Sequence, residues 1–211
     1  MVKTLIYQLL PRLWGKGKFS SIDSGSLQYI KGLGAGYVWY TGMIRHATSA
    51  TENVVKGDAG SPYAITDYFD VNPYMADDPA DRMQEFSELI SRTHDAGLKV
   101  ILDFVPNHVA RQYCSIAKPA GVKDLGEGDN KDYHFSTDNN FYYCWGQPLD
   151  LSLIPADATL DRYVEQPAKA TGNDHFDNRP SRNDWYETVK LNYGIDYCDA
   201  GGRSEHFNPI P

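Results

Sequence analysis

The chain has 211 residues, of which 41% are hydrophobic, and a formal net charge of −8. That length suffices for one sizeable core, and an acidic chain without a basic cluster is not expected to bind nucleic acid. No apolar run is long enough to span a membrane, no signal peptide follows Met1, and the three cysteines show no CxxC spacing. We therefore expect a soluble protein without a disulfide framework or a zinc cluster; its compartment and oligomeric state are not predicted.

Aromatic residues are the unusual part of the composition. The chain contains 15 Tyr, 8 Phe and 4 Trp, and many of them lie in polar stretches rich in Gly, Asn and Asp. Flat rings beside carboxylates and amides suit a sugar, which offers an apolar face and a rim of hydroxyls. Most of these rings are nevertheless expected to hold long loops in place.

The first third of the chain shows two strand signals. Residues 4–10 form a short apolar run that Pro11 ends, which predicts a strand. Residues 35–40, which read Ala-Gly-Tyr-Val-Trp-Tyr, predict a second strand. A long polar loop is expected from residue 42 to about residue 72.

A helix is predicted between these two strands. Asp23 or Ser24 is a suitable N-cap, and Leu27 and Ile30 follow at helical spacing. A glycine, at position 32 or 34, is expected to end this helix because glycine readily adopts the left-handed conformation at a helix C-terminus.

A second helix has the clearest pattern in the chain. Asp77 or Asp78, followed by Pro79, is expected to begin it, and Gly97 to end it. Its apolar face is formed by residues at steps of three and four: Met83, Phe86, Leu89, Ile90 and Thr93.

The stretch 99–109 (Lys-Val-Ile-Leu-Asp-Phe-Val-Pro-Asn-His-Val) carries the candidate site. Its apolar run predicts a strand buried on both faces, which Pro106 ends. Asp103, Asn107 and His108 then lie at or just past the carboxyl end of that strand, where α/β folds place their chemistry. Any one of them can be ordinary loop polarity, but the three together favour a functional site.

The order strand, helix, strand, loop, helix, strand predicts a parallel sheet of an α/β fold. Beyond Val109 we find no amphipathic helix and only short strand-like pieces, at residues 140–145 and 187–191. Three βα units neither close a barrel nor make a well-covered open sheet. We therefore expect the chain to be the N-terminal piece of a longer protein.

Residues 103–108 (Asp-Phe-Val-Pro-Asn-His) resemble the first signature region of the α-amylase family, glycoside hydrolase family thirteen, which commonly reads D-x-V-x-N-H. Residues 6–12 and 36–41 resemble the first two barrel strands of that family. Residues 63–73 are similar to the segment before its second helix, and residues 148–152 are a weaker match to a motif late in its domain B.

This resemblance implies a fold and a division of the chain. Residues 1–109 would supply the first three βα units of a TIM (β/α)8 catalytic barrel. Residues 110–211 would form the irregular, loop-rich domain B, inserted after the third strand, and the lead-in to strand four. The barrel would be incomplete in this chain.

The resemblance also implies roles for four residues. Tyr63 matches the tyrosine that stacks under the sugar in the −1 subsite, and His108 the histidine that hydrogen-bonds a hydroxyl of that sugar. Asp103 matches an aspartate that chiefly orients its neighbours there. Asn107 matches an asparagine that ligates a structural calcium in many members, although not all members bind the ion. No other cofactor is expected.

The catalytic residues implied by the resemblance lie beyond Pro211, on strands four, five and seven of the barrel. The chain is therefore expected to be part of a retaining hydrolase of starch, glycogen or malto-oligosaccharides, and inactive alone. One alternative is a transglycosylase or a sucrose- or trehalose-type enzyme of the same family. Another is a non-catalytic sugar-binding or transporter-associated relative, against which the presence of both Asp103 and His108 counts.

Overall fold

The computed structural model describes residues 3–155 and 160–197. The chain divides into two compact units. The first comprises the described parts of Met1–His46 and Asp67–Phe104, and the second those of Ala47–Thr66 and Val105–Pro211. The expected lead-in to a fourth strand, Cys198 and His206 lie outside the described residues.

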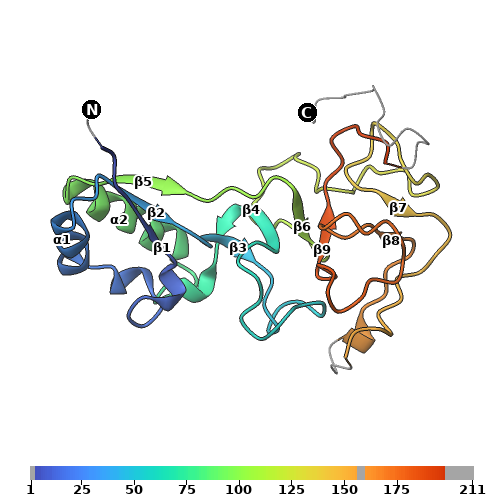
Figure 1. Cartoon of the computed structure of the whole chain (residues 1–211), viewed down its shortest axis with the longest axis horizontal. Helices are drawn as coiled ribbons and strands as arrows, with labels where there is room; N and C mark the ends of the chain where they lie inside the picture. Colours follow the sequence, from blue (N-terminus) through green and yellow to red (C-terminus); the bar gives the residue numbers. More distant parts are fainter. Residues whose placement is uncertain (1–2, 156–159, 198–211) are drawn as a thin grey trace. The chain divides into compact units, whose positions relative to one another are not determined.

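The first unit is built on a parallel sheet (Figure 1). Its strands are β1 (Ile6–Leu9), β2 (Tyr37–Tyr40) and β5 (Lys99–Leu102), in the order β1-β2-β5. Residue Tyr37 pairs with Ile6 on one side and Lys99 on the other. This arrangement confirms the parallel sheet that the sequence predicted.

Helix α1 (Ser24–Gly32) begins and ends as predicted. The Asp23 carboxylate accepts a hydrogen bond of 2.8 Å from the backbone N–H of Ser26, which satisfies one of the free donors of the first turn. Gly34 follows with φ +89°, a conformation that costs glycine little.

Helix α2 (Arg82–Asp95) begins later than predicted. The Glu85 carboxylate accepts hydrogen bonds of 2.8 Å from the backbone N–H groups of Asp77 and Asp78, so these residues form a turn that precedes the helix. The C-terminal prediction is confirmed, since Gly97 has φ +74°. None of the helices in the described part of the chain is long and apolar enough to cross a membrane.

The core of the first unit lies between the sheet and the helices. Helix α2 contacts both β5 and α1, and the Thr93 hydroxyl of α2 lies 2.7 Å from the Tyr40 hydroxyl of β2. Three short 3-10 turns complete the unit: η1 (Pro11–Leu13), η2 (Phe19–Ser21) and η3 (Pro73–Met75). Fully buried apolar side chains of this core include Phe19, Ile22, Leu27, Ile30, Val38 and Leu89.

The prediction that the strand at 99–102 is buried on both faces is wrong for the described sheet. β5 is an edge strand with β2 as its one neighbour, and Leu102 at its end is 44% exposed. Phe104 just beyond it is 70% exposed. Full burial of this apolar run would need a further neighbouring strand. The spacing of apolar residues does not show whether the chain provides one.

The long loop predicted from residue 42 to 72 contains two strands. β3 (Ile44–His46) pairs with β4 (Ile65–Val71), whose last five residues belong to the first unit. His46 is 4% exposed, and the Asn72 side-chain amide lies 3.0 Å from its ring. His46 is therefore a buried residue of β3.

Asp70 of β4 is the centre of a buried ion-pair cluster. Its fully buried carboxylate lies 3.0 Å from Arg45 and 2.7 Å from Arg82. Burial acts to raise the pKa of Asp70, but the hydrogen bonds from Arg82 and Arg45 outweigh it, so that the pKa is lowered from its ordinary value.

Replacing Asp70 with asparagine is expected to destabilise the chain by about 1.5–3 kcal/mol near neutral pH, the usual contribution of hydrogen bonds to a charged group. Because the folded pKa lies below the unfolded one, the wild type gains this stability only above the unfolded value of about 3.9 and loses it as the pH falls through the folded pKa. Urea unfolding at neutral and at strongly acid pH measures the difference. If the free energies of unfolding of the wild type and the variant differ by the same amount at both pH values, the prediction is contradicted.

The second unit has little regular structure, as expected. β6 (His108–Ala110) pairs with β9 (Thr188–Lys190), and β7 (Tyr143–Cys144) pairs with β8 (Ala168–Lys169), both antiparallel. A single 3-10 turn, η4 (Leu160–Arg162), is the only helical element among its described residues.

The compact units do not follow the boundary expected at residue 109. β6 spans that boundary, and its pairing with β9 places His108 in the second unit. The segment 47–66 also belongs there, since the backbone N–H groups of Asn53 and Val54 donate to the Gln112 side chain at 2.7 and 3.1 Å. This division is set by contacts between segments that are distant in the sequence. The spacing of residues along the chain does not reveal such contacts.

Candidate functional site

His108 is the best-defined member of the candidate site. It opens β6 opposite Lys190 of β9 and is only 7% exposed. The centroid of its ring lies 5.2 Å from that of Trp185, whose side chain is 46% exposed. β6 and the loops beside β9 thus hold the imidazole next to one aromatic side chain, that of Trp185, which is open to solvent.

Asn107 fixes the orientation of that imidazole. Its side-chain N–H donates to the Gly172 carbonyl at 2.8 Å, and the same nitrogen lies 3.0 Å from His108 Nδ1. Its side-chain oxygen faces the Lys190 ammonium at 3.4 Å, which agrees with this orientation of the amide. His108 Nδ1 is therefore an acceptor, and the neutral ring carries its proton on Nε2.

The His108 ring is neutral near pH 7. Burial lowers the pKa of His108, and the positive charge of Lys190 lowers it further, while a hydrogen bond with the Tyr63 backbone acts in the opposite direction. That hydrogen bond brings together two residues that the sequence analysis had selected separately. The side chain of Tyr63 stays 40% exposed, so its ring can still meet a ligand.

Gly172 leaves the space in which His108 sits. A Cβ atom at this position would lie 2.4 Å from the Thr188 hydroxyl oxygen and 2.9 Å from the His108 Cβ. These contacts are too short for any side chain, so the close approach of the loop to β6 and β9 requires glycine here.

Asp103 lies in the first unit, directly after β5. Its Oδ1 accepts a hydrogen bond of 2.7 Å from the Trp39 indole N–H. Its Oδ2 is buried and accepts no hydrogen bond from the described residues. A buried carboxylate oxygen without a hydrogen-bond donor is unusual in a folded protein.

The residues around Asn107 do not fit the calcium ion that the family resemblance implies. Ca²⁺ takes about 6–8 oxygen ligands at short distance, whereas the side-chain oxygen of Asn107 here faces the ammonium group of Lys190. Within residues 3–155 and 160–197, no group of three or more His, Cys, Asp or Glu side chains is arranged to hold a metal ion.

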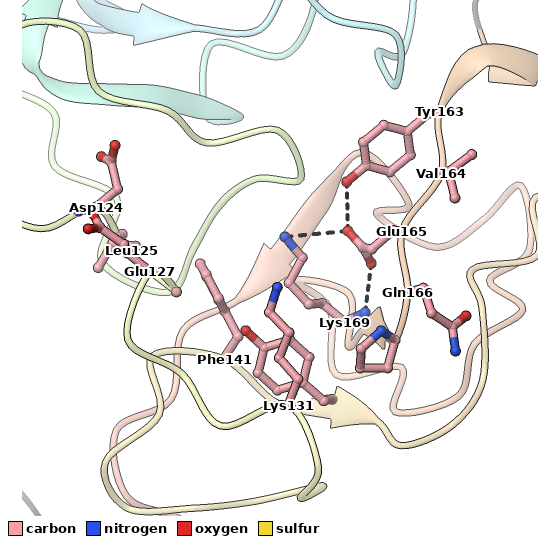
Figure 2. A pocket seen from close by; sticks show the side chains of 13 residues that line it. Asp124, Leu125, Glu127, Lys131, Phe141, Tyr163, Val164, Glu165, Gln166 and Lys169 are labelled. Atoms are coloured by element: carbon pink, nitrogen blue, oxygen red, sulfur yellow. Dashed lines mark hydrogen bonds and ion pairs between the residues drawn. The ribbon is translucent and has the colours of Figure 1, made fainter.

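A cavity of about 390 Å³ lies elsewhere in the second unit, with Asp124, Glu127, Lys131, Tyr163, Glu165 and Lys169 in its wall. Figure 2 shows the Glu165 carboxylate joined to Tyr163 and Lys169. It accepts hydrogen bonds of 2.7 Å from the Tyr163 hydroxyl and the Lys169 backbone N–H, and of 2.5 Å from Arg111. Glu165 is therefore fully engaged and serves the packing of the unit.

Three members of the site were missed by sequence reasoning. Trp185 was one of many aromatics in polar surroundings, and Gly172 and Lys190 belong to no motif used above. The strand-like piece at 187–191 was the only signal near Lys190. Nothing in local spacing shows that this strand pairs with the one that begins at His108.

Residues 15–190 match the alpha-amylase family, described as "Alpha amylase, catalytic domain". An oligo-1,6-glucosidase from Bacillus cereus is 25% identical over 203 residues, which cover 92% of this chain and 34% of that protein. The amino acid transporter heavy chain SLC3A1 of Mus musculus is 28% identical over 114 residues, or 51% of this chain and 14% of that protein.

Among solved structures, that of an alpha-amylase from Lactobacillus plantarum is 33% identical and has a TM-score of 0.45. The match covers 54% of this chain and 24% of that one. The present chain thus spans between 14% and 34% of the length of these three relatives.

Proposed function

The chain belongs to the alpha-amylase family of glycoside hydrolases, and from this we propose that it forms part of a retaining enzyme acting on α-glucosidic bonds of starch, glycogen or malto-oligosaccharides. Members of this family have a TIM-barrel catalytic domain. The observation that carries the proposal is the neutral, oriented imidazole of His108 beside Tyr63, in the segment that matches the family.

We propose that β1, β2 and β5 are the first three strands of that barrel, and that most of the second unit is domain B. Their parallel order, with α1 and α2 between them in the chain, supports this assignment. So do the exposed apolar side chains at the two edges: Leu5 is 48% and Ile6 46% exposed at the start of β1, and Leu102 and Phe104 are exposed at the end of β5. Further barrel strands would cover these edges.

We propose Tyr63, Asp103 and His108 as the residues of this chain that contribute to holding the sugar. The exposed ring of Tyr63 offers a stacking face, and the His108 ring, held by Asn107 and by the Tyr63 backbone, lies beside that residue. The Asp103 carboxylate is held in place by the Trp39 indole N–H. These groups bind and orient a sugar without breaking a bond.

We propose that the nucleophile and the acid/base are not supplied by this chain. Retaining hydrolysis needs two carboxyl groups about 5–5.5 Å apart. The carboxylates near His108 have other partners: Asp174 pairs with Lys190 at 2.5 Å, and Asp184 accepts from the Ser181 hydroxyl at 2.7 Å. Turnover of p-nitrophenyl α-glucoside by the 211-residue chain alone would contradict this part of the proposal.

The functional test uses the whole protein that contains this chain. Replacing His108 with alanine is expected to lower kcat/KM on malto-oligosaccharides by about 10- to 100-fold, because losing the ring beside Tyr63 misplaces the substrate, and small misplacements are costly. The exposed His94 provides the matched control, and its alanine variant should keep the wild-type kcat/KM. Wild-type kinetics for the His108 variant, or no α-glucosidase activity in the whole protein, would overturn the assignment.

The similarity to SLC3A1 gives a second candidate, a non-catalytic subunit of a membrane transporter. Such a subunit would bind no α-glucoside productively, so the same assay separates the two candidates. Analysis of the products separates the remaining alternative, since a transglycosylase or a sucrose- or trehalose-type enzyme would transfer or rearrange glucosyl units.

A further inference from the structure

Lys190 occupies an unusual position for a lysine. Its side chain is only 9% exposed, although it ends in a charged ammonium group. The ammonium lies 2.5 Å from the Asp174 carboxylate and 3.4 Å from the side-chain oxygen of Asn107. The Tyr197 ring lies on a further side, with its centroid 5.4 Å away. A carboxylate, an amide oxygen and a ring face together compensate for the lost hydration of the charge.

The backbone at Asp174 supports a structural role for this ammonium site. Asp174 has φ +67° and is the only non-glycine residue with positive φ in the described part of the chain. Its N–H donates to the Thr171 carbonyl at 3.1 Å, which closes a turn. Such a conformation is disfavoured for a residue with a Cβ and persists only where other contacts hold it. The ion pair with Lys190 is such a contact.

The Lys190 ammonium also connects three segments of the second unit. Asn107 precedes β6, Asp174 belongs to the turn after β8, and Lys190 ends β9. Asn107 in turn binds the Gly172 carbonyl of the same turn. One positive charge therefore holds together the segments that surround His108.

We propose that the Lys190 ammonium takes the structural place of the calcium ion that the family resemblance implies at Asn107, and that the chain binds no calcium there. The oxygens of Asn107 and Asp174 that a cation would use already face a positive charge. A divalent ion placed among them would be repelled by Lys190 at short range. This inference does not rest on the proposed hydrolase activity and would stand if that activity were absent.

Calcium binding by the unmodified 211-residue chain is the direct test. Isothermal titration with calcium chloride is expected to show no saturable binding. The melting temperature is expected to be the same in millimolar calcium and in excess EGTA. Stoichiometric binding, or a melting temperature that calcium raises and EGTA lowers, would overturn the proposal, and neither measurement depends on a variant.

Replacing Lys190 with methionine tests the structural role of the ammonium. The melting temperature is expected to fall by roughly 3–10 °C, and calcium should not restore it. The Asp174→Asn variant removes the ion pair but keeps the backbone conformation, which asparagine also adopts. Its melting temperature should therefore fall by less, again independently of calcium. A Lys190→Met variant that melts like the wild type would overturn the proposal.

Lys118 provides the matched control. It pairs with Asp124 in the same unit, but its side chain is 27% exposed. Replacing it with methionine should shift the melting temperature by no more than about 2 °C, because the charge of Lys118 keeps more of its hydration than that of Lys190. A fall as large as that of Lys190→Met would show that the loss of any lysine destabilises this unit and would contradict the proposal.

Discussion

Replacing Arg111 with methionine is expected to reduce the free energy of unfolding by about 3–5 kcal/mol, the usual cost of removing one partner of a buried ion pair. The Arg111 side chain is fully buried. Its guanidinium donates to Glu165 at 2.5 Å, to the Tyr186 carbonyl at 2.7 Å and to the Lys169 carbonyl at 3.2 Å. Methionine fills much of the volume but makes none of these hydrogen bonds.

The cost arises chiefly from Glu165, which stays buried when Arg111 is removed. Burial acts to raise the pKa of Glu165, but the charges of Arg111 and Lys169 outweigh it and lower the pKa, so the carboxylate is ionised in the folded chain. Without Arg111 it keeps Lys169, whose ammonium is 3.4 Å away. One ammonium at this longer distance, with the hydrogen bonds from the Tyr163 hydroxyl and the Lys169 N–H, leaves much of the desolvation of the charge uncompensated.

Urea unfolding of the chain measures this effect, with Arg179→Met as the matched control. Arg179 also forms an ion pair, 3.1 Å from Asp150, but the side chains are 52% and 40% exposed, so its loss should cost at most about 1 kcal/mol. Adding Glu165→Gln to Arg111→Met should recover part of the lost stability, because the unpaired charge is then removed. An Arg111 variant within 1 kcal/mol of its control would contradict the prediction.

Replacing Gly60 with alanine is expected to cost about 3 kcal/mol or more and to disturb the segment that carries Tyr63. A Cβ atom at Gly60 would lie 1.8 Å from the Ala47 carbonyl oxygen, a backbone atom that a rotamer change does not move. Gly60 also has φ +64°, so the substitution adds backbone strain to the clash. The backbone N–H of Ala47 donates to the Ala64 carbonyl at 2.8 Å, next to Tyr63.

Gly57→Ala separates the two causes, because Gly57 has φ +77° but no atom within 4 Å of the added Cβ. This control should cost about 1–2 kcal/mol, from backbone strain alone. Urea unfolding gives both values, and hydrogen exchange of the Tyr63 and Ala64 amides should report faster opening in the Gly60 variant only. Equal costs for the two variants would contradict the clash at Ala47.

Local signals predicted the elements of the first unit well. The Asp23 cap and the positive φ at Gly97 lie where the sequence placed them, because capping and the left-handed conformation depend on neighbours in the chain. The start of α2 was misplaced because Glu85 binds the preceding backbone from within the helix. The burial of β5 was overestimated because whether a strand has a second neighbour depends on the tertiary structure.

The sequence by itself determined the parallel βα order, the family to which the chain belongs, and the choice of Tyr63, Asp103, Asn107 and His108 as candidate residues. Only the tertiary structure decided which groups these residues meet. The side-chain oxygen of Asn107 faces Lys190, 83 positions further along the chain, and Arg111 pairs with Glu165, 54 positions away. Such contacts depend on the paths by which irregular loops come to pack against β6 and β9. Neither hydrophobic periodicity nor motif spacing predicts those paths.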